Sequence, residues 1–274
     1  MLTGAYTIYY LGRRVRMMRQ VHRPTRGCSR RSARPGPEVT APAPVADAIF
    51  YTGLAADAAF TLGVRHRVTG PAHAALLLWT LSYRNSWSMI FHSDNNLVLH
   101  TAVLGLSPSA DALSVDAPHL GSGRQHWRYG VPSHLISAVT AATYLVAGVD
   151  KVKGPLGWSW ASGESLRSQI VADGLRKELL GSSAAPAGVR MYAHTGLFRL
   201  LAAGSLALEL AAPLALLDRR LGRLWAVNAF GMHWGIRAIM GIRFRYNMSG
   251  VMYASFFPVE RVLPGDVAVR RADD

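Results

Sequence analysis

Lys151 is the residue of this chain whose type and setting are best suited to chemistry. It ends a long apolar run, seven residues after Tyr144, so that both side chains lie on one face of a predicted helix. A partly desolvated lysine gives up its proton more readily than one in water, and it can then act as a base. We therefore predict Lys151 as a catalytic residue and Tyr144 as a ligand-binding residue. The alternative is a lysine that only anchors the helix end at a membrane surface.

Arg84 stands inside a second apolar run, and a polar turn containing Asp94 and Asn95 follows it. A charge at bilayer depth costs roughly 2.5–3.5 kcal/mol on insertion scales, so it is retained mainly where something uses it. The sequence predicts that these three residues bind an anionic headgroup or another small ligand. One structural alternative is an ion pair between Arg84 and another helix, for which Glu209 is the natural partner. A second is that Asp94, Asn95 or Asn96 caps the helix that follows.

His233 and Arg237 are four residues apart in a third apolar run, which places them on one face of a helix. Such a face could bind an anion or a quinone-like carbonyl group, and we predict both residues as ligand-binding. Gly231 and Gly235 form a Gly-x-x-x-Gly step, which lets a neighbouring membrane helix approach closely. The alternative for His233 and Arg237 is therefore a polar packing contact between helices.

The remaining histidines and the single cysteine, Cys28, lack the spacing of a metal site. The sequence also has no Walker loop, dinucleotide fingerprint or nucleophile elbow. We predict no metal, and the identity of any cofactor stays undetermined.

The elements that position these residues are predicted to be membrane helices. Half of the residues are hydrophobic and 17% are charged, whereas soluble domains have about 25% charged residues. A chain of 274 residues has room for about six to eight spans of roughly 20 residues each. We predict an all-α fold, a polytopic transmembrane helical bundle in the cell membrane. The lipid bilayer is the first predicted partner.

Three regions follow from the distribution of apolar residues. Residues 1–44 are predicted to be a basic, disordered segment, residues 45–258 the transmembrane bundle, and residues 259–274 a polar tail. The expected spans cover residues 45–64, 71–91, 96–109, 133–149, 192–217, 223–242 and 246–258.

The net charge of +14 raises the possibility of nucleic-acid binding, but its distribution argues against this. Nine arginines lie between Arg13 and Arg34, and the other basic residues are scattered among short connections. Basic residues that flank apolar spans are typical of membrane topology and of contact with anionic lipids. We predict no nucleic-acid partner.

The order of several motifs resembles the HTTM family, the membrane domain that vitamin K-dependent gamma-carboxylases share with many bacterial proteins. The resemblance covers roughly residues 45–258. The matching pieces are Gly63-Val64-Arg65-His66-Arg67, Arg84-Asn85 with Asp94-Asn95, Leu113-Ser114-Val115-Asp116-Ala117, Tyr144 to Val152 followed by Trp158 or Trp160 and Gly163-Glu164, Glu209 to Pro213, and Phe230 with His233.

The resemblance implies a bundle of membrane helices with Lys151 at the position of a proposed catalytic base. In the carboxylases that lysine is proposed to react with reduced vitamin K and oxygen. This chain departs from the family pattern because no histidine follows Asn95 and Asn96. We also expect no counterpart of the large soluble domain that holds the carboxylation substrate.

Two classes of function remain open at this stage. In the first, the chain is a membrane enzyme or lipid-binding protein for a small lipophile, either quinone-like or an anionic lipid, with an unknown reaction. In the second, it is a non-catalytic accessory or protective subunit that binds another membrane protein. The first class predicts that the polar residues converge on one site, and the second predicts separate pairs between helices. A transporter is a weaker third possibility, because no inverted repeat is visible.

Overall fold

The structure is a computed structural model that describes residues 1–23, 41–86, 92–111, 114–117 and 127–259. Every regular element in these ranges is an α-helix or a 3₁₀ helix, so the predicted all-α class is confirmed. The chain divides into two compact units, Met1–Ile136 with Val259–Asp274 and Ser137–Pro258. The predicted single bundle over residues 45–258 therefore consists of parts of two units.

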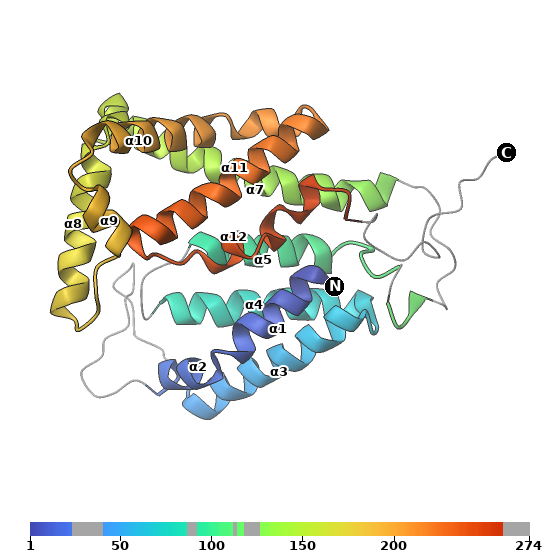
Figure 1. The fold of residues 1–274 in the computed structure, drawn as a ribbon. Helices are drawn as coiled ribbons and strands as arrows, with labels where there is room; N and C mark the ends of the chain where they lie inside the picture. The colour runs from blue at the N-terminus through green and yellow to red at the C-terminus, as the bar shows by residue number, and fades with distance from the viewer. Residues whose placement is uncertain (24–40, 87–91, 112–113, 118–126, 260–274) are drawn as a thin grey trace. The chain divides into compact units, whose positions relative to one another are not determined.

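The first unit is built on a hairpin of two long helices, α3 and α4, with α1 and α5 packed beside it (Figure 1). Gly63 ends α3 with a left-handed backbone (φ 72°), a conformation that glycine adopts at little cost. The elements of this unit are α1 (Leu2–Gly12), α2 (Val15–Val21), α3 (Ala43–Leu62), α4 (His66–Asn85), α5 (His92–Gly105) and the beginning of α7 (Trp127–Lys153).

A glycine pair brings α4 and α5 together. A Cβ atom placed on Gly70 would lie 2.5 Å from the carbonyl oxygen of Gly105, and one placed on Gly105 would lie 2.5 Å from that of Gly70. Real Cβ atoms do not approach backbone this closely, so only glycine fits at either position. Contacts between small residues are the usual way in which membrane helices pack.

The second unit continues α7 and folds the rest of the chain around it. Asp218 caps α11, where its carboxylate accepts hydrogen bonds from the backbone N–H groups of Arg220 (2.7 Å) and Leu221 (3.2 Å). These bonds lower the pKa of Asp218. The further elements are η1 (Gly157–Ser162), α8 (Glu164–Leu179), α9 (Pro186–Met191), α10 (Thr195–Leu210), η2 (Ala212–Leu216), α11 (Arg219–Met240), α12 (Arg245–Met248) and η3 (Val251–Phe256).

Two helices, Ala43–Leu62 and Trp127–Lys153, are long and apolar enough to cross a membrane. Their 20 and 27 residues correspond to lengths of about 30 and 40 Å, compared with about 30 Å of bilayer hydrocarbon. Only 28% of the apolar window in each helix is buried inside the protein. A core helix of a soluble protein would be mostly buried, so these exposed apolar faces suggest membrane association.

Most of the other expected spans are largely helical as well, although the span expected at 192–217 divides into α10 and the 3₁₀ helix η2. The apolar run over residues 246–258 is not a continuous helix, because it divides into α12 and η3. Gly250 separates them with a left-handed backbone (φ 79°). The prediction of a seventh span is therefore wrong.

Disorder was expected throughout residues 1–44, and it is wrong for residues 2–21, which form α1 and α2. One side of these helices is buried in the first unit, including Tyr6, Tyr10 and Met18. Residues 24–40, with Cys28, and most of the predicted tail (260–274) lie outside the described residues.

Candidate functional site

The C-terminal half of α7 carries a polar face formed by Tyr144 and Lys151. Gly148 lies between them, and a Cβ atom there would be 3.0 Å from the Cβ of Glu209 on α10. The absence of a side chain at position 148 therefore lets Glu209 lie directly against α7. The seven-residue spacing predicted that Tyr144 and Lys151 share a face, and both side chains do meet partners in this unit.

Lys151 forms an ion pair with Glu209. Its Nζ atom donates to both carboxylate oxygens, at 2.6 Å from Oε2. The Nζ atom also lies 4.4 Å from the ring centroid of Trp160, a cation–π distance. The Lys151 side chain is 26% exposed and that of Glu209 is 8% exposed. The lysine is thus a paired ammonium at the edge of the unit, and it could serve as a base only after transferring its proton.

About two helical turns before Lys151 on α7, Tyr144 lies in a buried network of polar groups. Its hydroxyl contacts the hydroxyl of Tyr253 and lies 3.2 Å from Nδ1 of His233. The side-chain amide of Asn247 donates to the same hydroxyl at 3.4 Å. The ring of Trp225 packs edge-on against Tyr144 with 4.9 Å between centroids. We call Tyr144, His233, Asn247 and Tyr253 the tyrosine–histidine cluster.

The hydrogen bonds of His233 fix its neutral tautomer. Nδ1 lies 2.9 Å from the carbonyl oxygen of Ala229. A carbonyl oxygen only accepts, so Nδ1 carries the proton, and Nε2 of the neutral ring is an acceptor. No residue in the described ranges donates a hydrogen bond to Nε2. The Oδ1 atom of Asn247 is fully buried and has no partner among the described residues. The tyrosine–histidine cluster thus contains two acceptors that the described protein groups leave without a donor.

Arg237 does not belong to this cluster. His233 is buried, whereas Arg237 is exposed and its guanidinium lies 5.1 Å from the ring centroid of Trp234. The structure therefore does not bring His233 and Arg237 into one site, because the His233 ring lies in the core and the Arg237 side chain lies at the surface. A Cβ atom on Gly231 or Gly235 would meet nothing within 4 Å, so no described helix packs on this glycine step.

Arg84 and Asp94 meet in the first unit, where α4 and α5 lie side by side. Nη2 of Arg84 donates to Asp94, and Nη1 donates to the hydroxyl of Tyr10 at 3.0 Å. Tyr10 in turn donates to the other oxygen of Asp94 at 2.8 Å. The side chains of Arg84 and Asp94 are 6% and 3% exposed. This closed triad ties α1 to the α4–α5 pair.

Two predictions about these residues are corrected by the triad. Arg84 pairs with Asp94 rather than with Glu209, because residues on consecutive antiparallel helices become neighbours when they lie at similar distances from the turn. Asp94 does not cap α5, since α5 begins at His92 and the carboxylate turns toward Arg84 instead. Asn95 is exposed on α5 and lies outside the triad.

The sequence interpretation missed a buried pair, Asp57 of α3 and His73 of α4. Their side chains are 0% and 1% exposed, and Nε2 of His73 lies 3.3 Å from Oδ1 of Asp57. Both residues lie at similar distances from the turn at Gly63, and this symmetry could have revealed the pair. Tyr10, Asn247 and Tyr253 were also missed. The one signal in the sequence was near Asn247, where Asn247, Ser249 and Gly250 interrupt the apolar run of an expected span.

Within the described residues, no group of three or more His, Cys, Asp or Glu side chains is placed to hold a metal ion. The comparisons with known proteins add no family, since no protein-family model, no curated protein and no solved structure matches this chain.

Proposed function

We propose that this chain is a multi-pass membrane protein whose second unit binds a small, hydroxyl-bearing lipophile of the quinol type at the tyrosine–histidine cluster. Two helices with sufficient length and apolar character, α3 and α7, support the membrane setting. The remaining long helices, α4, α5, α10 and α11, would complete a bundle of six spans. The motif order that resembles the HTTM family is consistent with this architecture, and its carboxylase members act on a reduced quinone.

The observation that carries the proposal is a fully buried acceptor without a donor, Oδ1 of Asn247, in the same cluster as the acceptor Nε2 of His233. A buried acceptor that lacks a donor costs about 1–3 kcal/mol, so such groups usually have a partner. A quinol supplies two hydroxyl donors on an apolar ring, which matches a polar cluster walled by Trp225 and Phe244.

In this proposal Lys151 lies on the same face of α7 as Tyr144, at the partly exposed edge of the unit. There it pairs with Glu209 of α10. The 2.6 Å contact between Nζ and Oε2 allows a proton to pass from the lysine to the carboxylate, which would leave a neutral amine. That amine is the base that the family resemblance assigns to Lys151. The reaction that would follow is left open.

The proposal is tested by adding a short-chain hydroquinone to the detergent-purified protein and following its thermal unfolding. We expect a concentration-dependent rise in Tm for the wild-type protein, because a ligand that binds only the folded state stabilises it. The rise should be lost in His233→Ala and in Asn247→Leu.

The matched control is Arg237→Ala on the same helix as His233, since Arg237 lies outside the cluster. It should keep the full rise in Tm. Equal shifts in the wild type, His233→Ala and Arg237→Ala would show that the hydroquinone binds elsewhere or only partitions into detergent.

A second candidate function is a non-catalytic membrane subunit, and one observation favours it. Gly231 and Gly235 lie on a face of α11 that also exposes Leu224 and Val227, which are 63% and 57% exposed. A partner helix could pack on this face through the glycine step. Gly231→Leu would then break a co-purifying complex on native gels and leave hydroquinone binding unchanged.

A further inference from the structure

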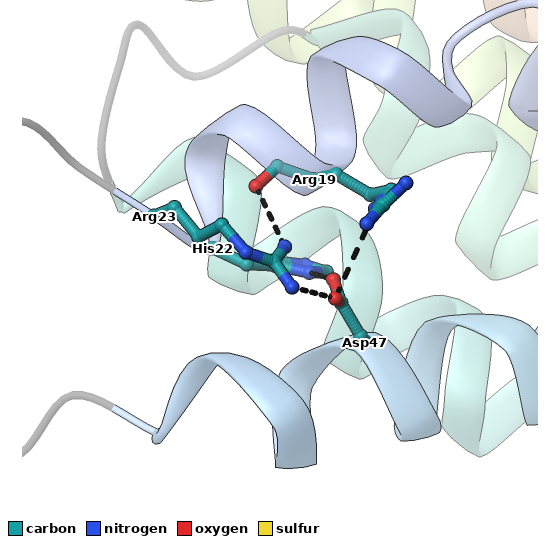
Figure 2. Close-up of polar contacts among 4 residues, drawn as sticks. All are labelled: Arg19, His22, Arg23 and Asp47. Carbon is teal, nitrogen blue, oxygen red and sulfur yellow. Dashed lines mark hydrogen bonds and ion pairs between the residues drawn. The ribbon is translucent and has the colours of Figure 1, made fainter.

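A second charged site lies in the first unit, where the short basic helix α2 packs beside the beginning of α3. Figure 2 shows Asp47 of α3 reaching toward three side chains from the α2 segment, Arg19, His22 and Arg23. Nδ1 of His22 lies 2.7 Å from Oδ1 of Asp47. Arg23 donates to Oδ2, and Nε of Arg19 lies 3.9 Å from the same atom. One carboxylate therefore positions two guanidinium groups.

The two arginines keep most of their donors free of this carboxylate. Each guanidinium has five N–H groups, and the side chains of Arg19 and Arg23 are 53% and 46% exposed. Arg23 also donates to the backbone oxygen of Arg19 at 3.3 Å, which holds the Arg23 side chain against the backbone of α2. The site is preorganised and retains a net positive charge.

These arginines border a groove on α2 with a volume of about 480 Å³. Val15, Arg16, Arg19, Gln20 and Arg23 line it. No acidic residue is among them, and Asp47 contacts only two of the three arginines. Guanidinium groups bind phosphate through paired hydrogen bonds, and several arginines around one groove are suited to a phosphate group.

The groove on α2 lies beside the beginning of α3, and this position indicates the source of the phosphate. α3 begins at Ala43, and Asp47 lies only one turn further along the helix. If α3 crosses the bilayer, its first turns lie at the level of the lipid headgroups. Basic residues at this level are attracted to anionic lipids by roughly 1 kcal/mol for each lysine or arginine.

We propose that the α2 groove binds the phosphate headgroup of an anionic membrane lipid, held by Arg16, Arg19 and Arg23. This inference rests on the membrane insertion of α3 that is part of the proposed function. It is independent of the quinol-type ligand in the second unit, so either site can fail its test while the other passes.

The test measures binding of the full-length protein in detergent to nanodiscs that contain phosphatidic acid, with phosphatidylcholine nanodiscs as reference. We expect the Arg16→Gln, Arg19→Gln and Arg23→Gln triple variant to bind phosphatidic acid roughly 100-fold more weakly, given about 1 kcal/mol for each arginine. A control variant with the same loss of charge elsewhere, Arg199→Gln, Arg219→Gln and Arg220→Gln, should keep wild-type affinity. Equal weakening in both triple variants would reduce the effect to general charge attraction and overturn the proposal.

A triple arginine-to-lysine variant at positions 16, 19 and 23 separates geometry from charge. It keeps the positive charge but loses the paired hydrogen bonds, so we expect binding between that of the wild type and that of the glutamine variant. Wild-type affinity in the lysine variant would show that paired hydrogen bonds from the arginines are not needed, and it would overturn the proposed phosphate-binding groove. Circular dichroism of all variants checks that the helices remain folded.

Inorganic phosphate distinguishes a lipid site from a site for the free ion. Millimolar phosphate should compete only weakly with the nanodiscs, because the lipid is also held by the bilayer. Binding of phosphate by the wild type with no preference for phosphatidic acid nanodiscs would overturn the lipid assignment.

Discussion

Lys151 of α7 and Glu209 of α10 form an ion pair across a helix contact that Gly148 makes possible. The pair joins two segments 58 residues apart in sequence. It also adds a partner that neither sequence interpretation of Lys151, as a base or as an interfacial anchor, had assigned to it. The carboxylate of Glu209 could receive the proton of the lysine.

Breaking this pair on one side should be costly. Lys151→Met leaves Glu209 buried without its partner, and we expect a loss of about 2–3 kcal/mol in the free energy of unfolding. The double variant Lys151→Met with Glu209→Leu should recover most of this loss, because an apolar pair needs no desolvation of charge. Denaturant titration of the four proteins of this cycle measures the coupling. Additive losses in the double variant would mean that the two residues do not interact.

The Arg84–Asp94 pair should behave as a structural element of the first unit. Arg84→Leu strands a carboxylate that is 3% exposed, and we expect about 3–5 kcal/mol of destabilisation. Tyr10→Phe removes two hydrogen bonds of the triad and should cost about 1–2 kcal/mol. Unfolding of the purified variants gives both values. A stable Arg84→Leu protein that has lost a bound ligand would instead restore the ligand-binding role predicted for Arg84.

The glycine contact between α4 and α5 should tolerate no added methyl group. Gly70→Ala and Gly105→Ala each place a carbon 2.5 Å from a backbone oxygen, and we expect a loss of about 1–3 kcal/mol from each overpacking. Gly130→Ala on α7 is the matched control, since nothing lies within 4 Å of the added carbon. It should be neutral or stabilising by up to about 1 kcal/mol. Equal effects at all three positions would contradict the close approach.

Acid should weaken the contact between α8 and α11 through Asp173. Partial burial raises the pKa of this carboxyl, but hydrogen bonds from Lys177 and Arg176 outweigh it and leave the pKa below its ordinary value of 3.8. A carboxylate with a depressed pKa stabilises the fold above its unfolded pKa and loses this contribution as the pH falls. Lys177 also donates to the carbonyl oxygen of Met240 at the end of α11.

We therefore expect the wild-type Tm to fall more steeply than that of Asp173→Asn as the pH drops below about 4. Thermal unfolding between pH 6 and pH 3 makes the comparison. Parallel curves for the two proteins would show that Asp173 contributes no pH-dependent stability.

The two ends of α10 should face opposite sides of the membrane. Cys28 is the only cysteine, so Cys28→Ser gives a background for single-cysteine labelling. Ser159→Cys, in η1 beside the beginning of α10, and Arg219→Cys, after its end, should react with an impermeant reagent from opposite sides of sealed vesicles. Labelling of both positions from the same side would contradict a span at α10.

The sequence predicted the helices of the chain better than their partners. Apolar runs in the sequence mark α3, α4, α5, α7, α10 and α11 as helices, since each helix needs only local pattern and length, and two of the helices, α3 and α7, are long and apolar enough to cross a membrane. Lys151 and Tyr144 could be placed on one face for the same reason. Their partners Glu209 and Tyr253 lie 58 and 109 residues away, and no local pattern specifies which helices pack together.

The two errors at the chain ends have local causes. The arginine-rich composition of residues 13–34 obscured the apolar side of α2, where Met18 is only 1% exposed. At the other end, the apolar average over residues 246–258 obscured Gly250, whose left-handed backbone ends one helix and begins another. In both places the prediction followed the average composition of the segment and missed a single residue, Met18 or Gly250, that shows the local structure.

Native mass spectrometry of the detergent-purified protein, with co-purifying lipids and quinones retained, tests the central claim most directly. We predict one small hydroxyl-bearing lipophile per chain in the wild type and in Arg237→Ala, and its loss in His233→Ala. A wild-type protein that carries no such molecule, or that carries a second polypeptide in its place, would contradict the ligand-binding account and favour the membrane subunit.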